Sequence, residues 1–65
     1  MVNLSKREFE VAELISLGYS NKQIASKLFL SEHTIKAILE NLYLKLGINN
    51  RVLLAVYYIK NYCRD

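Results

Sequence analysis

The feature of this sequence that most constrains its fold is a serine preceded by a large apolar residue, which occurs three times, at Ser5, Ser20 and Ser31. A serine in this position can accept a hydrogen bond from one of the unpaired backbone N–H groups that begin a helix. Three residues after the first two serines stand Glu8 and Gln23, whose side chains can complete a capping box. An apolar residue follows four positions after each serine and can pack back onto the residue before the cap. The repeat therefore predicts three helix starts.

Glycine marks the expected helix ends. The chain contains no proline, and its two glycines are Gly18 and Gly47. Glycine adopts the left-handed backbone conformation that ends many helices, so we expect stops here rather than mobile linkers. Asn50 is a suitable cap for one further helix. We therefore predict a single all-α domain over residues 1–65, with the short link 29–31 as the compact turn of a helix-turn-helix unit. Its four helices are expected at about residues 6–17, 21–28, 32–46 and 50–62.

Apolar residues recur at helical spacing in the first three predicted helices, so each of these helices has one face to bury. The 32–46 helix has the longest apolar stripe, and the stripe runs along its whole length. We expect a single core formed where these stripes meet. Its expected members are Val11, Leu14, Ile15, Ile24, Ala25, Leu28, Ile35, Ile38, Leu39, Leu42 and Leu46.

The opposite face of the 32–46 helix carries side chains that can read DNA. One interpretation is an ordinary solvated face. As the second helix of a helix-turn-helix unit, however, this helix would enter the major groove, where short side chains, Lys and Asn read base edges. We therefore favour groove reading. The face comprises His33, Lys36, Ala37, Glu40, Asn41 and Leu44, with Thr34 toward one edge.

The last predicted helix is apolar on every side between residues 52 and 59. A helix of this kind is buried on more than one side, and a domain this small has a core for one side. We therefore expect a second subunit to cover the other side. Two alternatives stay open: the tyrosines flank a generous core with their hydroxyls in water, or another domain of a longer parent protein covers this face.

Composition disfavours several classes of protein. The single cysteine, Cys63, cannot form an internal disulfide, which suits a reducing cytosol. The sequence has no Cys/His cluster with zinc-ligand spacing, no glycine-rich phosphate loop and no apolar run of membrane-spanning length. We therefore expect a soluble, cytoplasmic protein with no cofactor, metal, membrane contact or small-molecule ligand. An enzyme is the least favoured class, because His33 has no nucleophile arranged beside it.

The charge of the chain is compatible with a polyanion partner. Nine Lys+Arg against six Asp+Glu give a net charge of +3 and a pI near 9.2. The excess of basic residues lies in the last two thirds of the sequence, beyond residue 19. This distribution agrees with DNA binding but does not establish it alone.

Several strings of the sequence match one known pattern. Residues 18–25 read GYSNKQIA, residues 31–36 read SEHTIK, and residues 45–48 read KLGI, with Arg51 shortly after. With these strings the sequence resembles the LuxR-type (FixJ-type) helix-turn-helix domain over nearly its whole length. The resemblance implies a bacterial transcription regulator, free-standing or the effector domain of a response regulator or quorum sensor. It also implies double-stranded DNA as ligand, a homodimer formed through the fourth helix, and RNA polymerase as a further candidate partner.

The resemblance also implies roles for individual residues. Lys36 can donate to guanine O6 or N7, and the Ala37 methyl can touch a thymine methyl. Three groups follow from matching positions. The base-reading group is His33, Lys36, Ala37 and Glu40; the phosphate-binding group is Ser20, Asn21, Lys22 and Thr34; the dimer group is Leu53, Val56, Tyr57 and Lys60.

Three positions depart from the pattern of the LuxR-type domain. Ile38 stands where a histidine is usual, Glu40 where basic or small residues are common, and Val52 with Leu53 where a polar pair is frequent. These departures predict weaker or differently specific DNA binding. The competing hypothesis is a helix-turn-helix protein-interaction module with weak or lost DNA binding that pairs through its fourth helix. The salt dependence of binding distinguishes the two hypotheses, because the affinity from phosphate contacts falls steeply as the salt concentration rises, whereas the affinity of apolar pairing does not.

Overall fold

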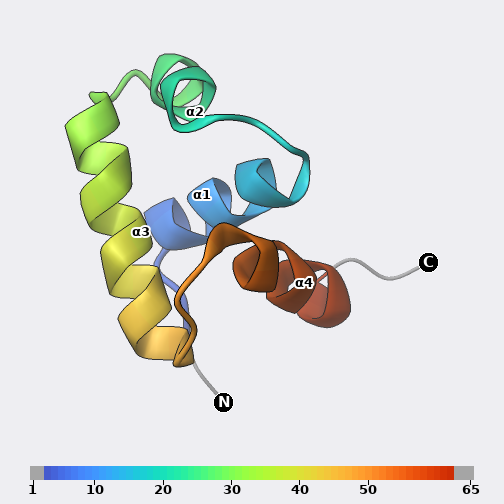
Figure 1. Cartoon of the computed structure of the whole chain (residues 1–65). Helices are drawn as coiled ribbons and strands as arrows, with labels where there is room; N and C mark the ends of the chain where they lie inside the picture. Colours follow the sequence, from blue (N-terminus) through green and yellow to red (C-terminus); the bar gives the residue numbers. More distant parts are fainter. Residues whose placement is uncertain (1–2, 63–65) are drawn as a thin grey trace.

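The computed structural model describes residues 3–62, and within that range it is built of helices without strands. The all-α class and the order of four helices agree with the prediction (Figure 1). The first helix ends one residue earlier than predicted, since Leu17 caps it, and the last begins one residue later. Cys63 lies outside the described residues. The helices are α1 Lys6–Ser16, α2 Asn21–Leu28, α3 Glu32–Leu46 and α4 Arg51–Tyr62.

The helices begin at the residues that the capping pattern indicates. Ser5 and Ser20 each form a complete capping box, with Glu8 and Gln23 respectively. The Ser31 hydroxyl accepts a hydrogen bond from the Thr34 N–H at 3.0 Å. The start of α4 is capped by Asn50 Oδ1, which accepts from the Leu53 N–H at 2.9 Å. Local hydrogen bonds therefore define where each helix starts.

Three helix ends pass through the left-handed region of backbone conformation. Gly18 and Gly47 do so with φ of 91° and 67°, as expected. Phe29, at the end of α2, does so with φ of 59°. The N–H of Leu30 then donates to the Ala25 carbonyl at 2.9 Å, which closes the turn between α2 and α3. The sequence did not predict a left-handed phenylalanine, because this conformation disfavours residues with a Cβ.

The core lies where α1 packs against α3 and α4, with α2 closing one end against α3 (Figure 1). Its buried residues come from all four helices. Four residues predicted for the core, Leu14, Leu28, Ile38 and Leu46, lie half-buried at its rim instead. The buried set is Val11, Ala12, Ile15, Ile24, Ala25, Ile35, Leu39, Leu42, Leu54 and Tyr58.

A partly buried ion pair joins the start of α1 to the end of α3. Lys45 Nζ lies 2.6 Å from Glu8 Oε1, the same oxygen that accepts the Ser5 N–H. This bond to Lys45 is the main cause that lowers the pKa of Glu8, and the Ser5 N–H adds to the effect. The pair fixes the C-terminal end of α3 relative to α1.

Candidate nucleic-acid interface

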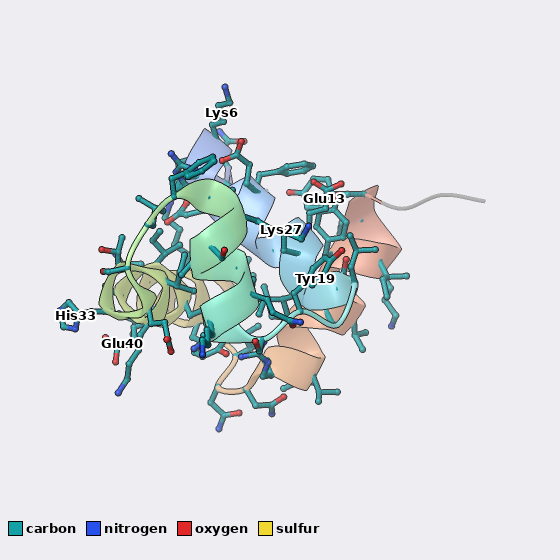
Figure 2. All side chains as sticks on the ribbon, turned by 90° about the horizontal axis from the view of Figure 1, so that it is seen from above. Lys6, Glu13, Tyr19, Lys27, His33 and Glu40 are labelled. Atoms are coloured by element: carbon teal, nitrogen blue, oxygen red, sulfur yellow. The ribbon has the colours of Figure 1, made fainter. Side chains whose placement is uncertain are left out.

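The helix α3 has one face in the core and one face directed away from the protein. Ile35, Leu39 and Leu42 are buried, whereas the opposite side chains are exposed. Figure 2 shows His33 and Glu40 projecting outward from α3, away from the rest of the molecule. Even Leu44, an apolar residue of this face, is 82% exposed. The outward face of α3, as the term is used below, comprises His33, Lys36, Ala37, Glu40, Asn41 and Leu44, and all are exposed.

The charged side chains of this face are not engaged with the rest of the protein. Lys36 and Glu40 stand one helical turn apart, yet among residues 3–62 neither forms an ion pair or a hydrogen bond. The two ion pairs that do form in this range are Arg7–Glu10 and Lys45–Glu8. The outward face therefore offers a cationic donor, Lys36, and an anionic acceptor, Glu40, to a ligand, beside the polar side chains of His33 and Asn41.

The four predicted phosphate ligands lie at the first turns of α2 and α3. The Ser20 hydroxyl is occupied by the Gln23 N–H at 3.2 Å, so this residue orders the helix start. Lys22 is exposed and Asn21 is half-buried. Thr34 is also half-buried, with its hydroxyl 2.9 Å from that of Ser31. Unpaired N–H groups and the helix dipole make such helix starts favourable places for an anion.

One side of α4 is exposed and apolar. Leu54 and Tyr58 are buried against the core, and the side opposite to them faces outward. Of the predicted dimer residues, Leu53, Val56 and Lys60 are exposed. Val52 and Ile59 extend the apolar surface, with 69% and 48% exposure. The exposed face of α4, as the term is used below, comprises Val52, Leu53, Val56 and Ile59.

Tyr57, the fourth predicted dimer residue, is half-buried at the edge of an aromatic group. Its ring contacts Tyr62 edge-on, with centroids 6.2 Å apart. Burial raises the pKa of the Tyr57 phenol, and the neighbouring Tyr62 raises it further. Phe9 of α1 contacts the rings of Tyr58 and Tyr62 at 5.3 and 5.0 Å. The C-terminal half of α4 is therefore held on α1 by aromatic packing.

Sequence reasoning missed two polar links that hold the interface in place. Arg51 Nη1 donates to Asn21 Oδ1 at 2.8 Å, and its Nη2 donates to the Tyr19 carbonyl at 2.7 Å. Lys45 reaches Glu8 in the same long-range manner. Both links join residues at least 30 positions apart. Pairing over such distances leaves no periodic signal in one sequence; the position of Arg51 in the LuxR-type pattern was the available hint.

Residues 3–62 bring together no group of three or more metal-ligating side chains. In the same range, every helix is too short or too polar to cross a bilayer.

A short turn between α2 and α3, with an open outward face on the second of the two helices, defines the helix-turn-helix class. A family profile described as bacterial regulatory proteins, luxR family, matches residues 2–58. Because this match covers most of the sequence, the chain belongs to the LuxR family of bacterial regulatory proteins.

Individual relatives agree with the family. The oxygen regulatory protein NreC of Staphylococcus aureus strains JH9, JH1 and Mu3 is 46% identical to this chain over 57 residues. The alignment covers 88% of this chain and 26% of the relative. The chain thus spans about a quarter of the length of these curated relatives.

Proposed function

We propose that this chain binds double-stranded DNA sequence-specifically, with α3 in the major groove, and acts as a transcription regulator or as the effector domain of one. The observation that carries the proposal is the outward face of α3, whose side chains are exposed and whose charged groups lack partners within residues 3–62. A helix anchored on one side by Ile35, Leu39 and Leu42 presents its other side rigidly. Rigid presentation is what direct readout of base edges requires. Such a regulator works where the bacterial chromosome lies, in the cytoplasm.

Each exposed group of α3 suits a particular base edge. The Lys36 ammonium is a donor and fits the O6 and N7 acceptors of guanine. The Glu40 carboxylate is an acceptor and fits the cytosine N4 amino group. The Ala37 methyl fits the thymine C5 methyl, and His33 contacts a base from the first turn of α3. Glu40 also disfavours any register that brings it against a phosphate, so it contributes specificity at the expense of affinity.

Phosphate contacts position the protein on the duplex. Asn21 and Lys22 lie at the start of α2, where Ser20 caps the helix and the dipole favours an anion. Thr34 lies in the first turn of α3. Contacts of this type fix register and supply the salt-dependent part of the affinity, but carry no sequence information.

A homodimer through α4 completes the proposal. The exposed face of α4 is apolar. Burial of apolar surface contributes a free energy of about 25 cal/mol per Å², which favours covering this face with a second copy. At helical spacing, Lys60 follows Val56 by one turn and lies within this face, and Tyr57 follows Leu53 by one turn at its edge. Two copies would present two outward faces of α3 to successive major grooves, and the operator would be an imperfect palindrome. RNA polymerase is a candidate partner on the family resemblance alone.

A second candidate function is a protein-interaction module with weak DNA binding. Glu40 favours it, because a carboxylate on the outward face of α3 repels phosphate. The exposed face of α4 also favours it, since that face can pair without DNA.

Selection of duplexes from a random DNA pool tests the proposed function. We expect a recurring, roughly palindromic site, and we expect its affinity to fall steeply between 50 and 200 mM salt, as phosphate contacts require. A pool with no recurring sequence, together with weak binding that salt hardly changes, would favour the interaction module instead.

A further inference from the structure

Arg51 connects the first turn of α4 to the first turn of α2. Its guanidinium donates from Nη1 to Asn21 Oδ1 at 2.8 Å and from Nη2 to the Tyr19 carbonyl at 2.7 Å. Both bonds are partly buried, and Arg51 itself is half-buried. Tyr19 is the residue before the Ser20 cap, so the guanidinium holds the backbone and the first side chain of α2 together.

The chemistry of these groups fixes which end of the Asn21 amide faces Arg51. A guanidinium only donates hydrogen bonds, so the amide must turn its oxygen toward Arg51. The Nδ2 group, which only donates, then points away from Arg51. Among residues 3–62, this Nδ2 group has no hydrogen-bond partner. A fixed, unused donor at a helix start is suited to a phosphate oxygen.

We propose that Arg51 is a positioning residue for DNA binding, which holds the Asn21 amide with Nδ2 presented to a phosphate of the duplex. Arg51 acts through Asn21 and the Tyr19 carbonyl, not by contacting a base. This inference rests on the proposed function, since it needs a duplex at the start of α2. It adds a role for a residue on α4, a helix otherwise assigned to dimerisation.

The two bonds that Arg51 makes predict that lysine does not replace this arginine. The two acceptors are bonded by two separate nitrogens of one planar group. A lysine ammonium keeps the charge but offers one nitrogen on a flexible stem. Arg51→Lys therefore removes the positioning and leaves the net charge of the protein unchanged.

A double-mutant cycle on the affinity for a selected duplex tests the role of Arg51. We expect Arg51→Lys and Asn21→Ala each to weaken binding about tenfold, the value of one hydrogen bond to a charged group. With Arg51→Lys already present, Asn21→Ala should weaken binding less than about twofold, because the amide is no longer positioned. Arg7→Lys, the same change at an exposed ion pair on α1, is the matched control and should bind as the wild type does.

Asn21→Asp separates positioning from folding. The aspartate keeps an acceptor for Arg51 but has no Nδ2 donor, so it should fold at least as stably as the wild type in urea and lose DNA affinity about tenfold or more. Wild-type affinity of Asn21→Asp, or strictly additive losses in the cycle, would overturn the role of Arg51 while DNA binding by the wild type stands. Failure of the wild type to bind any duplex would instead overturn the proposed function, and this inference with it.

Discussion

Glu8 illustrates how much one side chain contributes to this small fold. One oxygen, Oε1, accepts both the Ser5 N–H that begins α1 and the Lys45 ammonium at the end of α3. Glu8 is 8% exposed, whereas the Lys45 side chain is 41% exposed, so the ion pair is shielded from water mainly on the Glu8 side. The pKa of Glu8 is held below its ordinary value of 4.5, with the Lys45 bond as the main cause. The ionised carboxylate therefore stabilises the native state.

Glu8→Gln should lower the free energy of unfolding by about 1 to 2 kcal/mol at pH 7, since a partly buried bond to a charged partner is lost and the exposure of Lys45 screens part of its value. Because the folded-state pKa of Glu8 lies below 4.5, its contribution is fully present above that pH and disappears as pH falls through the lowered value. Urea unfolding of wild type and variant from pH 7 into acid should show the two stabilities converging. Glu10→Gln, at an exposed pair, should change stability by less than about 1 kcal/mol. A difference in the free energy of unfolding between wild type and Glu8→Gln that stayed constant with pH would contradict this role for Glu8.

Phe29 carries local strain without compensating burial. It adopts φ of 59°, and its side chain is 94% exposed. Phe29→Gly should therefore raise the free energy of unfolding by up to about 1 kcal/mol, because the left-handed conformation costs glycine nothing. Thermal and urea unfolding measure the change. Destabilisation by this substitution would show that the phenylalanine ring is held by contacts.

Among the helices, α3 has one face that is buried in the core and one face that is open to a ligand. Its inner face is buried in the core through Ile35, Leu39 and Leu42. The outward face of α3 is exposed to solvent. The ion pair from Lys45 to Glu8 and the turn at Phe29 fix its two ends. Function at the outward face can therefore change without loss of the fold.

Lys36→Ala should weaken binding to the selected duplex by about 1 to 3 kcal/mol and relax the preference at one base pair, as loss of a donor to guanine requires. Fluorescence anisotropy with single-base variants of the site measures both effects. Lys6→Ala removes the same charge from α1, at a side chain that projects to a different side of the molecule from His33 and Glu40 (Figure 2), and should bind with nearly unchanged preference. If Lys36→Ala bound every site as the wild type does, Lys36 would not read a base.

Glu40→Lys should strengthen binding to random duplex, because an acidic side chain facing the groove becomes a basic one. The same substitution should weaken the preference for the selected site, since the acceptor for cytosine is lost. Titrations with random and selected duplexes at one salt concentration compare the two effects. Unchanged affinity for random duplex would mean that residue 40 does not face DNA.

For the whole molecule, α4 has a buried side and an open apolar side. Leu54 and Tyr58 pack on the core, and the exposed face of α4 points outward. A small domain gains much of its stability from a partner at such a surface. In the proposed dimer, this surface would link the oligomeric state to the spacing of the DNA half-sites.

Val56→Glu should convert the protein to monomers in analytical ultracentrifugation, because it places a charge in the centre of the exposed face of α4. Affinity for the full palindrome should fall far more than affinity for a single half-site. Leu17→Glu adds the same charge at an exposed apolar residue after α1 and serves as control. A dimer that persisted in Val56→Glu would place the subunit contact elsewhere.

Local sequence patterns predicted most of the fold. They did not predict the side-chain bonds between residues far apart in the sequence. Ser5, Ser20 and Ser31 indicated the helix starts because capping is a bond between near neighbours. Periodicity separated the two faces of α3, since a helix places residues by angle alone. The Arg51 link to Asn21 spans 30 positions, and its geometry depends on how four helices close on one another. The left-handed Phe29 was missed because the sequence signal for that conformation is glycine.

A titration of the selected duplex into labelled protein, followed by the backbone and side-chain amide resonances, tests the central claim most directly. The account predicts shifts at the start of α2, including the Asn21 side-chain amide, and along the outward face of α3, with the buried residues of α1 little changed. Shifts confined to α4, or an α3 whose resonances do not move while DNA is bound, would contradict it.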